Sequence, residues 1–240
     1  MSFALQGQRA LVIGAAGGIG QATARVMAEL GADLVLVDRV APDALSDQIR
    51  ADGGSAAALG GDVTDAATRS AILEAAGPLD ILVYLAALCP WDEWTEPGWD
   101  SVFDDVMAVN LKAPLQLARA VMPGMAARGR GRIVLVGSVA GRIGGLIAGP
   151  HYVASKGGLH ALVKWLAQRG GPQNVLVNGV APASTETAMI AGQPVDLTRI
   201  PLRRKSQPDE IAWPIAFLCS PAASYVCGTV LDVNGGVAMV

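Results

Sequence analysis

The sequence predicts an α/β fold, a single doubly wound domain over residues 1–240 with a seven-stranded parallel sheet. Short β-branched runs alternate along the chain with helical patterns, as parallel strands joined by crossover helices do. Four of the runs, ALVIG, LVLV, DILVY and IVLVG, are continuously apolar, which is typical of strands buried on both faces. Helices are therefore expected on both sides of the sheet, with ligands at the carboxyl ends of the strands.

The expected elements follow one another at short intervals. The predicted strands cover residues 9–13, 34–37, 56–59, 81–84, 132–136, 175–180 and 230–233. The predicted helices cover residues 20–29, 44–51, 67–75, about 99–122, 151–169 and 209–218. Residues 211–231 carry no charge, but Pro214 and Pro221 interrupt them. A core helix followed by a strand is therefore expected there, not a membrane span.

Composition points to a compact domain that acts on a small molecule. Of 240 residues, 52% are hydrophobic and 16% charged, which suits a large buried core. The net charge of −3, without runs of like charge, lacks the basic surface that nucleic acid or an anionic membrane requires. Cys89, Cys219 and Cys227 have no metal-ligand spacing, and no secretory signal is seen. No metal is predicted, and the cysteines are interpreted as reduced, buried thiols of a cytoplasmic protein.

A glycine-rich turn directly follows the first predicted strand and opens the first helix. Glycines let the backbone turn tightly and approach a pyrophosphate, whose charge then meets the free N–H groups at a helix N-terminus. A purely structural turn is the alternative, because a glycine cluster alone is weak evidence. The residues expected to bind a dinucleotide here are Gly14, Gly17, Gly18, Ile19 and Gly20.

An acidic residue ends the second strand, where a carboxylate meets the adenosine ribose of a dinucleotide. Asp38 would accept hydrogen bonds from the ribose 2′-hydroxyl and repel a 2′-phosphate, so NAD is predicted over NADP. Arg39 works against this choice because a guanidinium can recruit a phosphate. The alternative is a helix-capping aspartate followed by a surface arginine.

A second acidic position follows the third strand. Asp62 and Val63 could place an acceptor beside the adenine amino group. Equally, Asp62 or Thr64 could cap the helix that follows.

The strongest chemical pattern is a tyrosine and a lysine one helical turn apart. Tyr152 and Lys156 at i and i+4 share one face of a helix, where an ammonium would stabilise a phenolate and lower its pKa. Ser138 ends the fifth strand and could hold a substrate oxygen. Asn110 interrupts a helical pattern, which suggests a kink that holds a water. Taken singly, Ser138 and Asn110 have structural interpretations as a turn cap and a core kink.

Taken together, Gly14-x3-Gly18-x-Gly20, Asp38, Asn110, Ser138 and Tyr152-x3-Lys156 resemble the short-chain dehydrogenase/reductase family over essentially the whole chain. The resemblance implies a Rossmann-type domain with Tyr152 as acid/base and with Lys156 lowering its pKa and binding the nicotinamide ribose. It implies that Ser138 orients the substrate and that Asn110 holds a relay water. Further cofactor contacts are expected at Ala86, Ala87, Pro182 and Thr187, although Thr187 could simply cap a helix.

The chain departs from the family pattern beside the cofactor site. Tyr84-Leu85-Ala86-Ala87 stands where the family usually has Asn-Asn-Ala-Gly, which is expected to remove polar side chains that fix the sheet. Ile13 replaces a threonine before the glycine turn, and Ala183 replaces a glycine. These changes bear on cofactor affinity more than on the chemistry. They also leave open a nucleotide-binding scaffold protein with weak activity.

Within the family, the C-terminal part resembles both 3-oxoacyl-carrier-protein reductases and secondary-alcohol dehydrogenases. The first branch implies NADPH and basic residues at the mouth of the site. Arg128 and Arg130 could supply one contact, but Gln173 occupies the second basic position. With Asp38, this favours an NAD-dependent enzyme that acts on a small free alcohol or ketone.

The substrate is expected to lie between an apolar lid, at about residues 185–205, and an opposite wall. His151 could touch a substrate polar group, although packing at a helix start is favoured. Apolar residues of the long helices suggest a homodimer or homotetramer; they include Leu159, Leu162, Val163 and Leu166. The predicted lid residues are Met189, Ile190, Val195, Leu197 and Ile200, and the predicted wall residues are Leu88, Trp91, Trp94, Ile143, Leu146 and Ile147.

Overall fold

A computed structural model describes residues 2–145 and 147–239. Leu146, predicted for the apolar wall, lies outside the described residues. Seven strands form one parallel sheet in the order β3-β2-β1-β4-β5-β6-β7, which confirms the predicted fold. The strands are β1 (Arg9–Ile13), β2 (Asp33–Asp38), β3 (Ser55–Gly60), β4 (Ile81–Tyr84), β5 (Gly131–Val136), β6 (Val175–Pro182) and β7 (Val230–Val233).

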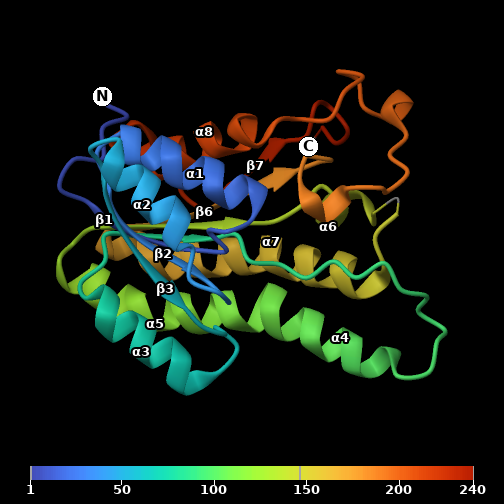
Figure 1. Cartoon of the computed structure of the whole chain (residues 1–240), viewed down its shortest axis with the longest axis horizontal. Helices are drawn as coiled ribbons and strands as arrows, with labels where there is room; N and C mark the ends of the chain where they lie inside the picture. Colours follow the sequence, from blue (N-terminus) through green and yellow to red (C-terminus); the bar gives the residue numbers. More distant parts are fainter. Residues whose placement is uncertain (1, 146, 240) are drawn as a thin grey trace.

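Helices cover both faces of the sheet (Figure 1). One layer contains α1 (Gly18–Glu29), α2 (Asp43–Ala51) and α8 (Pro208–Cys219). The other contains α3 (Ala66–Ala76), α4 (Trp99–Met107), α5 (Ala113–Ala127) and α7 (Pro150–Gly170). Short elements complete the chain: α6 (Ala140–Ile143) and the 3-10 turns Gly171–Gln173, Ala188–Ile190, Leu197–Arg199 and Pro221–Ala223.

Two hydrophobic cores lie on either side of the sheet. Along β1, Ala10 and Val12 pack in the core under α1 and α8, whereas Leu11 and Ile13 pack in the core under α5 and α7. Successive side chains of a strand point to opposite faces, so a strand buried on both faces must be apolar throughout. This explains the continuous apolar runs in the sequence.

The helix expected at about 99–122 is interrupted. A π-helical segment, Ala108–Lys112, separates α4 from α5, and α5 continues to Ala127. Pro114 explains part of this, because it has no N–H and leaves a carbonyl one turn earlier without a helical donor. The kink predicted at Asn110 therefore has a defined form, since Asn110 lies within the π segment.

Two expectations about apolar residues are wrong. Cys219 is buried, but Cys89 is half-buried and Cys227 is exposed, because Cys227 lies in the loop before β7. The four α7 residues named for an apolar surplus pack on the chain's own sheet instead: Leu159, Val163 and Leu166 are buried in the core, and Leu162 packs against it. These residues therefore give no support to a dimer or tetramer.

The uncharged stretch 211–231 forms most of α8, a loop and the start of β7, as predicted. Within the described ranges, no helix has both the length and the apolar composition needed to cross a membrane.

Candidate active site

The glycine turn lies where the strand order reverses, since β1 pairs with β2 on one side and β4 on the other. Gly14 has φ +87°, and a Cβ there would lie 2.5 Å from the backbone nitrogen of Ala86. Only glycine fits such a backbone conformation and approach without strain. Ligands of doubly wound sheets bind in the crevice at this kind of position.

The first helical turn of α1, directly after the glycine-rich loop, offers free N–H groups. Its N-cap residue is Gly17, which has no side chain that could accept from them. The N–H groups of a first helical turn have no acceptor within the helix, and they carry partial positive charge. Thr187 packs closely against Gly18, because a Cβ at Gly18 would lie 2.7 Å from Thr187 Cγ2. This cradle of glycines and free donors fits a dinucleotide pyrophosphate.

Asp38 is tied to the glycine turn. Its Oδ2 accepts a hydrogen bond of 2.9 Å from Ala16 N, and its Oδ1 accepts one of 2.8 Å from Arg39 N. It does not cap α2, whose N-cap is Pro42. The carboxylate is thus fixed at the end of β2, beside the cradle, and Arg39 is exposed next to it. The capping alternative for Asp38 is therefore wrong.

Asp62 and Val63 precede α3 but do not cap it. Asp62 Oδ1 accepts hydrogen bonds from Thr64 N at 2.8 Å and Thr64 Oγ1 at 2.7 Å, and these bonds lower its pKa. The cap is Asp65, which accepts from Thr68 N, so the capping interpretation of Asp62 or Thr64 is wrong. The Val63 side chain is buried in the core.

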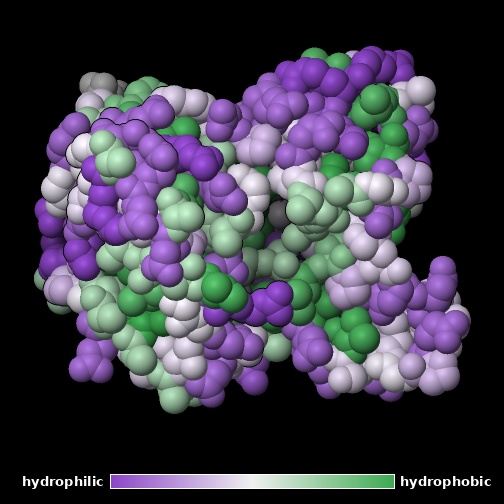
Figure 2. Space-filling view, in the orientation of Figure 1, coloured by the Kyte–Doolittle hydropathy of each residue, from purple (hydrophilic) through white to green (hydrophobic). Residues whose placement is uncertain are grey.

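A cavity of about 290 Å³ lies beyond the carboxyl ends of the strands. Figure 2 shows a hollow near the middle of the face, bordered mainly by pale and hydrophobic side chains, with hydrophilic ones at its lower edge. Of the predicted site residues, the cavity is lined by Ile19, Ala87, Ser138, Tyr152, Lys156, Pro182 and Thr187. Of the predicted wall and lid residues, it is lined by Trp91, Ile143, Ile147, Met189, Ile190, Val195 and Ile200, but not by Leu88, Trp94 or Leu197.

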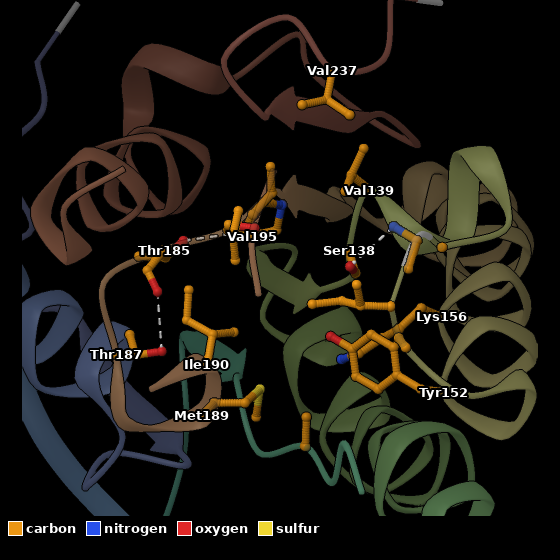
Figure 3. A pocket seen from close by; sticks show the side chains of 18 of the residues that line it. Ser138, Val139, Tyr152, Lys156, Thr185, Thr187, Met189, Ile190, Val195 and Val237 are labelled. Carbon is orange, nitrogen blue, oxygen red and sulfur yellow. Dashed lines mark hydrogen bonds between the residues drawn. The ribbon is translucent and has the colours of Figure 1, made fainter. Parts of the chain in front are cut away.

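Three polar side chains converge on one wall of the cavity. Tyr152 and Lys156 come from α7, and Ser138 follows β5, while Met189 and Ile190 lie across from them (Figure 3). Lys156 Nζ donates to the carbonyl of Val136 at 2.9 Å and lies 5.5 Å from the centre of the Tyr152 ring. Ser138 Oγ accepts from Ala140 N at 3.1 Å, so it closes the turn that leads into α6 as well as lining the cavity.

Burial dominates the titration of this group. It raises the pKa of Tyr152 above its ordinary value, while the Ser138 hydroxyl acts in the opposite direction. Burial also lowers the pKa of Lys156 to about 8. The sequence predicted that Lys156 would lower the pKa of Tyr152. Among the protein groups, desolvation of the phenolate is the larger effect and raises this pKa, so that prediction is wrong for the protein without cofactor.

Asn110 lies behind the cavity and is fully buried. Its Oδ1 accepts from Leu88 N at 2.8 Å, and its Nδ2 donates to Leu88 O at 2.9 Å and to Ser155 Oγ at 3.0 Å. Ser155 Oγ in turn donates to the carbonyl of Tyr152 at 2.8 Å. Asn110 thus connects the loop after β4 to α7, and its relay water stays a prediction.

Tyr84 corrects the expectation that its sequence stretch lacks a polar anchor. Its side chain is 1% exposed, and its hydroxyl donates to the carbonyl of Val109 at 2.6 Å. In an α-helix the carbonyl of Asn110 would accept from the N–H of residue 114, and in a π-helix the carbonyl of Val109 would do so. Residue 114 is Pro114, which has no N–H. The phenol therefore satisfies a backbone carbonyl that the helix leaves unpaired.

Each histidine is buried beside a polar residue that lines the cavity, His151 beside Tyr152 and His160 beside Ser138. His151 is 0% exposed, accepts from Tyr152 N at 2.7 Å and contacts Asp92 Oδ1 at 3.0 Å. It packs at the helix start and does not line the cavity, as favoured. Burial lowers the pKa of His160 to about 4, and its Nε2 faces Ser138 N at 3.4 Å.

The 3-10 turn after Thr187 is not capped by its side chain. Thr187 Oγ1 donates to Thr185 O at 3.3 Å (Figure 3), so the capping alternative is wrong. Sequence reasoning missed several cavity residues. They include Val139, Asp196, Arg199 and Val237.

Arg128 and Arg130, predicted as possible contacts for an acyl carrier protein, lie away from the cavity. Both residues directly precede β5, at the opposite end of the strand from Ser138. Both face Asp80, with Nε to Oδ1 distances of 3.9 and 3.1 Å. Within one chain they therefore do not border the cavity, and neither does Gln173.

Comparison with known proteins identifies the class of enzyme. A family model described as enoyl-(acyl carrier protein) reductase matches residues 14–238. Galactitol 2-dehydrogenase (L-tagatose-forming) of Cereibacter sphaeroides is 38% identical, over 98% of this chain and 96% of that protein. A 3-oxoacyl-[acyl-carrier-protein] reductase of Vibrio cholerae is 37% identical, over 98% of this chain and 99% of that protein.

The solved structures agree. A 3-oxoacyl-[acyl-carrier protein] reductase of Brucella melitensis superposes with a TM-score of 0.93 at 30% identity, over 99% of this chain and 94% of that chain. A proposed NAD(P)-dependent gluconate 5-dehydrogenase of Beutenbergia cavernae, with NADP bound at low occupancy, gives 0.91 at 35% identity, over 98% of both chains. The chain belongs to the short-chain dehydrogenase/reductase family, as an NAD(P)-dependent oxidoreductase of CH–OH groups and ketones.

Proposed function

We propose that the chain is an NAD-dependent dehydrogenase or ketone reductase for a small, free secondary alcohol or ketone, with Tyr152 as its acid/base. One observation carries this proposal: Tyr152, Lys156 and Ser138 line the same cavity. The glycine cradle and Asp38 lie at the same edge of the sheet.

The proposal gives each of these three side chains a role that fits its chemistry and its place in the cavity. Ser138 holds the substrate oxygen, and the Tyr152 hydroxyl exchanges a proton with it. Lys156, held by the carbonyl of Val136, stabilises the phenolate. Because its pKa is about 8, the ammonium remains charged at neutral pH. When bound, NAD supplies the hydride acceptor and, in its oxidised form, a further positive charge.

The preference for NAD is proposed from Asp38. Its carboxylate is fixed by Ala16 N and Arg39 N, so it cannot easily turn away from an added phosphate. A like charge at that point disfavours NADP. Relatives occur with either cofactor: Brucella and Beutenbergia structures hold NAD and NADP respectively. The fixed carboxylate of Asp38 is therefore the feature of this chain that supports the choice.

The second candidate is an NADPH-dependent 3-oxoacyl-carrier-protein reductase, favoured by the Vibrio cholerae relative. Other relatives act on a polyol, galactitol, and on cis-4-hydroxycyclohexanecarboxylate. A free substrate is supported because Arg128 and Arg130 are paired with Asp80 away from the cavity.

The experiment compares NAD(H) with NADP(H) across a panel of secondary alcohols, polyols, hydroxy acids and a keto-thioester, following nicotinamide absorbance. The proposal expects NAD-linked oxidation of free alcohols, with a higher kcat/KM than NADPH-linked reduction of the thioester. The reverse order would establish the reductase. Tight NADH binding without turnover of any compound would instead support a scaffold protein.

A further inference from the structure

The cavity is mostly apolar but contains charge away from Ser138 and Tyr152. Besides Lys156, its charged lining residues are Asp196 and Arg199. Both belong to the segment between β6 and α8, opposite the catalytic wall. Both residues are exposed, so the partners of each charge decide whether it is free to bind a ligand in the cavity.

Arg199 differs from the other basic residues of its segment. Arg203 donates to the carbonyl of Thr198 at 2.6 Å, Arg204 is paired with Glu210 at 2.6 Å, and Lys205 lies 3.7 Å from Glu186. Within the described ranges, the guanidinium of Arg199 has no carboxylate or carbonyl partner, and Arg199 alone of the four lines this cavity.

Asp196 does not neutralise Arg199 by direct pairing. Its Oδ1 accepts from Thr198 Oγ1 at 2.6 Å and from Thr198 N at 2.9 Å. These bonds, with a smaller effect of Arg199, lower the pKa of Asp196. The carboxylate is thus occupied in closing the 3-10 turn Leu197–Arg199, while the guanidinium keeps its donors.

We propose that Arg199 binds a carboxylate of the substrate, so that the enzyme acts on a small hydroxy or keto acid whose carbinol lies at Tyr152. This inference rests on the proposed function. An arginine offers two parallel donors that match a carboxylate. The apolar side chains of Ile143, Met189 and Val195 then surround the carbon skeleton between the two polar ends.

The test compares cyclic hydroxy acids of the hydroxycyclohexanecarboxylate type with their methyl esters, which keep the carbinol and remove the charge. The wild type should prefer the acid by at least about tenfold in kcat/KM, equivalent to about 1.4 kcal/mol. Arg199→Met should abolish that preference by raising KM for the acid, with the ester unaffected. Arg199→Lys should retain part of it.

Arg119→Met is the control, since Arg119 is an exposed arginine of α5 that does not line the cavity. It should leave the acid-to-ester ratio unchanged. Equal use of acid and ester by the wild type, or equal losses for both in Arg199→Met, would overturn the carboxylate assignment. So would an Arg199 effect confined to a coenzyme A thioester, whose phosphates would then be the anion. Absence of turnover with every alcohol would instead remove the proposed function itself.

Discussion

The hydroxyl of Tyr84 and the carbonyl of Val109 form a buried hydrogen bond of 2.6 Å between β4 and the π segment. Loss of the hydroxyl in Tyr84→Phe leaves that carbonyl without a partner. We expect a loss of about 1–3 kcal/mol in the free energy of unfolding, measured by urea denaturation. Tyr225→Phe is the control because Tyr225 is 102% exposed. Equal stability of both variants would show that the bond contributes nothing.

Gly18 and Thr187 bring the glycine cradle and the proposed lid into close approach. In Gly18→Ala the new Cβ would lie 2.7 Å from Thr187 Cγ2, so the Thr187 side chain or its segment must shift. We expect NADH to bind at least about tenfold more weakly, measured by fluorescence titration. Adding Thr187→Ser removes Cγ2 but keeps the hydroxyl, and it should recover part of the affinity. No recovery would place the effect of Gly18 elsewhere.

Asp38 is expected to set the cofactor preference through its charge. Asp38→Asn keeps an acceptor for Ala16 N and removes the repulsion of a 2′-phosphate. The ratio of kcat/KM for NADPH over NADH should rise at least about tenfold. A variant that retained the wild-type ratio would mean that Arg39 or the backbone decides the preference.

His160 should make stability fall in acid. Its folded pKa is about 4 against an ordinary 6.5, so the unfolded chain binds more protons between these values. Stability therefore rises with pH across this window, by up to about 3 kcal/mol, and is fully present above the ordinary pKa. Urea unfolding at several pH values should show a flatter profile in His160→Gln. Parallel profiles would contradict the assignment.

The sheet was predictable because burial on both faces leaves a direct trace in the sequence. Leu11 and Val12 belong to different cores, yet both must be apolar, so each central strand reads as an unbroken apolar run. The π segment left a weaker trace: Asn110 predicted a kink in the helical pattern but not its π-helical form. Pro114, which has no N–H, explains why the carbonyl of Val109 needs the Tyr84 hydroxyl as its donor.

The candidate site was predictable where one element holds the pattern. Tyr152 and Lys156 share a helix, so their spacing places both on one face. Their burial depends on residues distant in the sequence, which is why the direction of the tyrosine pKa was wrong. Arg199 was missed for the same reason. Arg204 and Lys205 are paired with Glu210 and Glu186, and sequence spacing alone does not show which basic residue of the segment lacks a carboxylate partner.

The central claim concerns proton transfer by Tyr152 in the cavity that it shares with Lys156 and Ser138. The most direct measurement is turnover of an identified substrate by Tyr152→Phe, with NADH affinity measured on the same preparation. We expect kcat to fall by about 10²–10⁴-fold while NADH binding stays close to that of the wild type. A Tyr152→Phe variant with near-normal kcat would contradict the account.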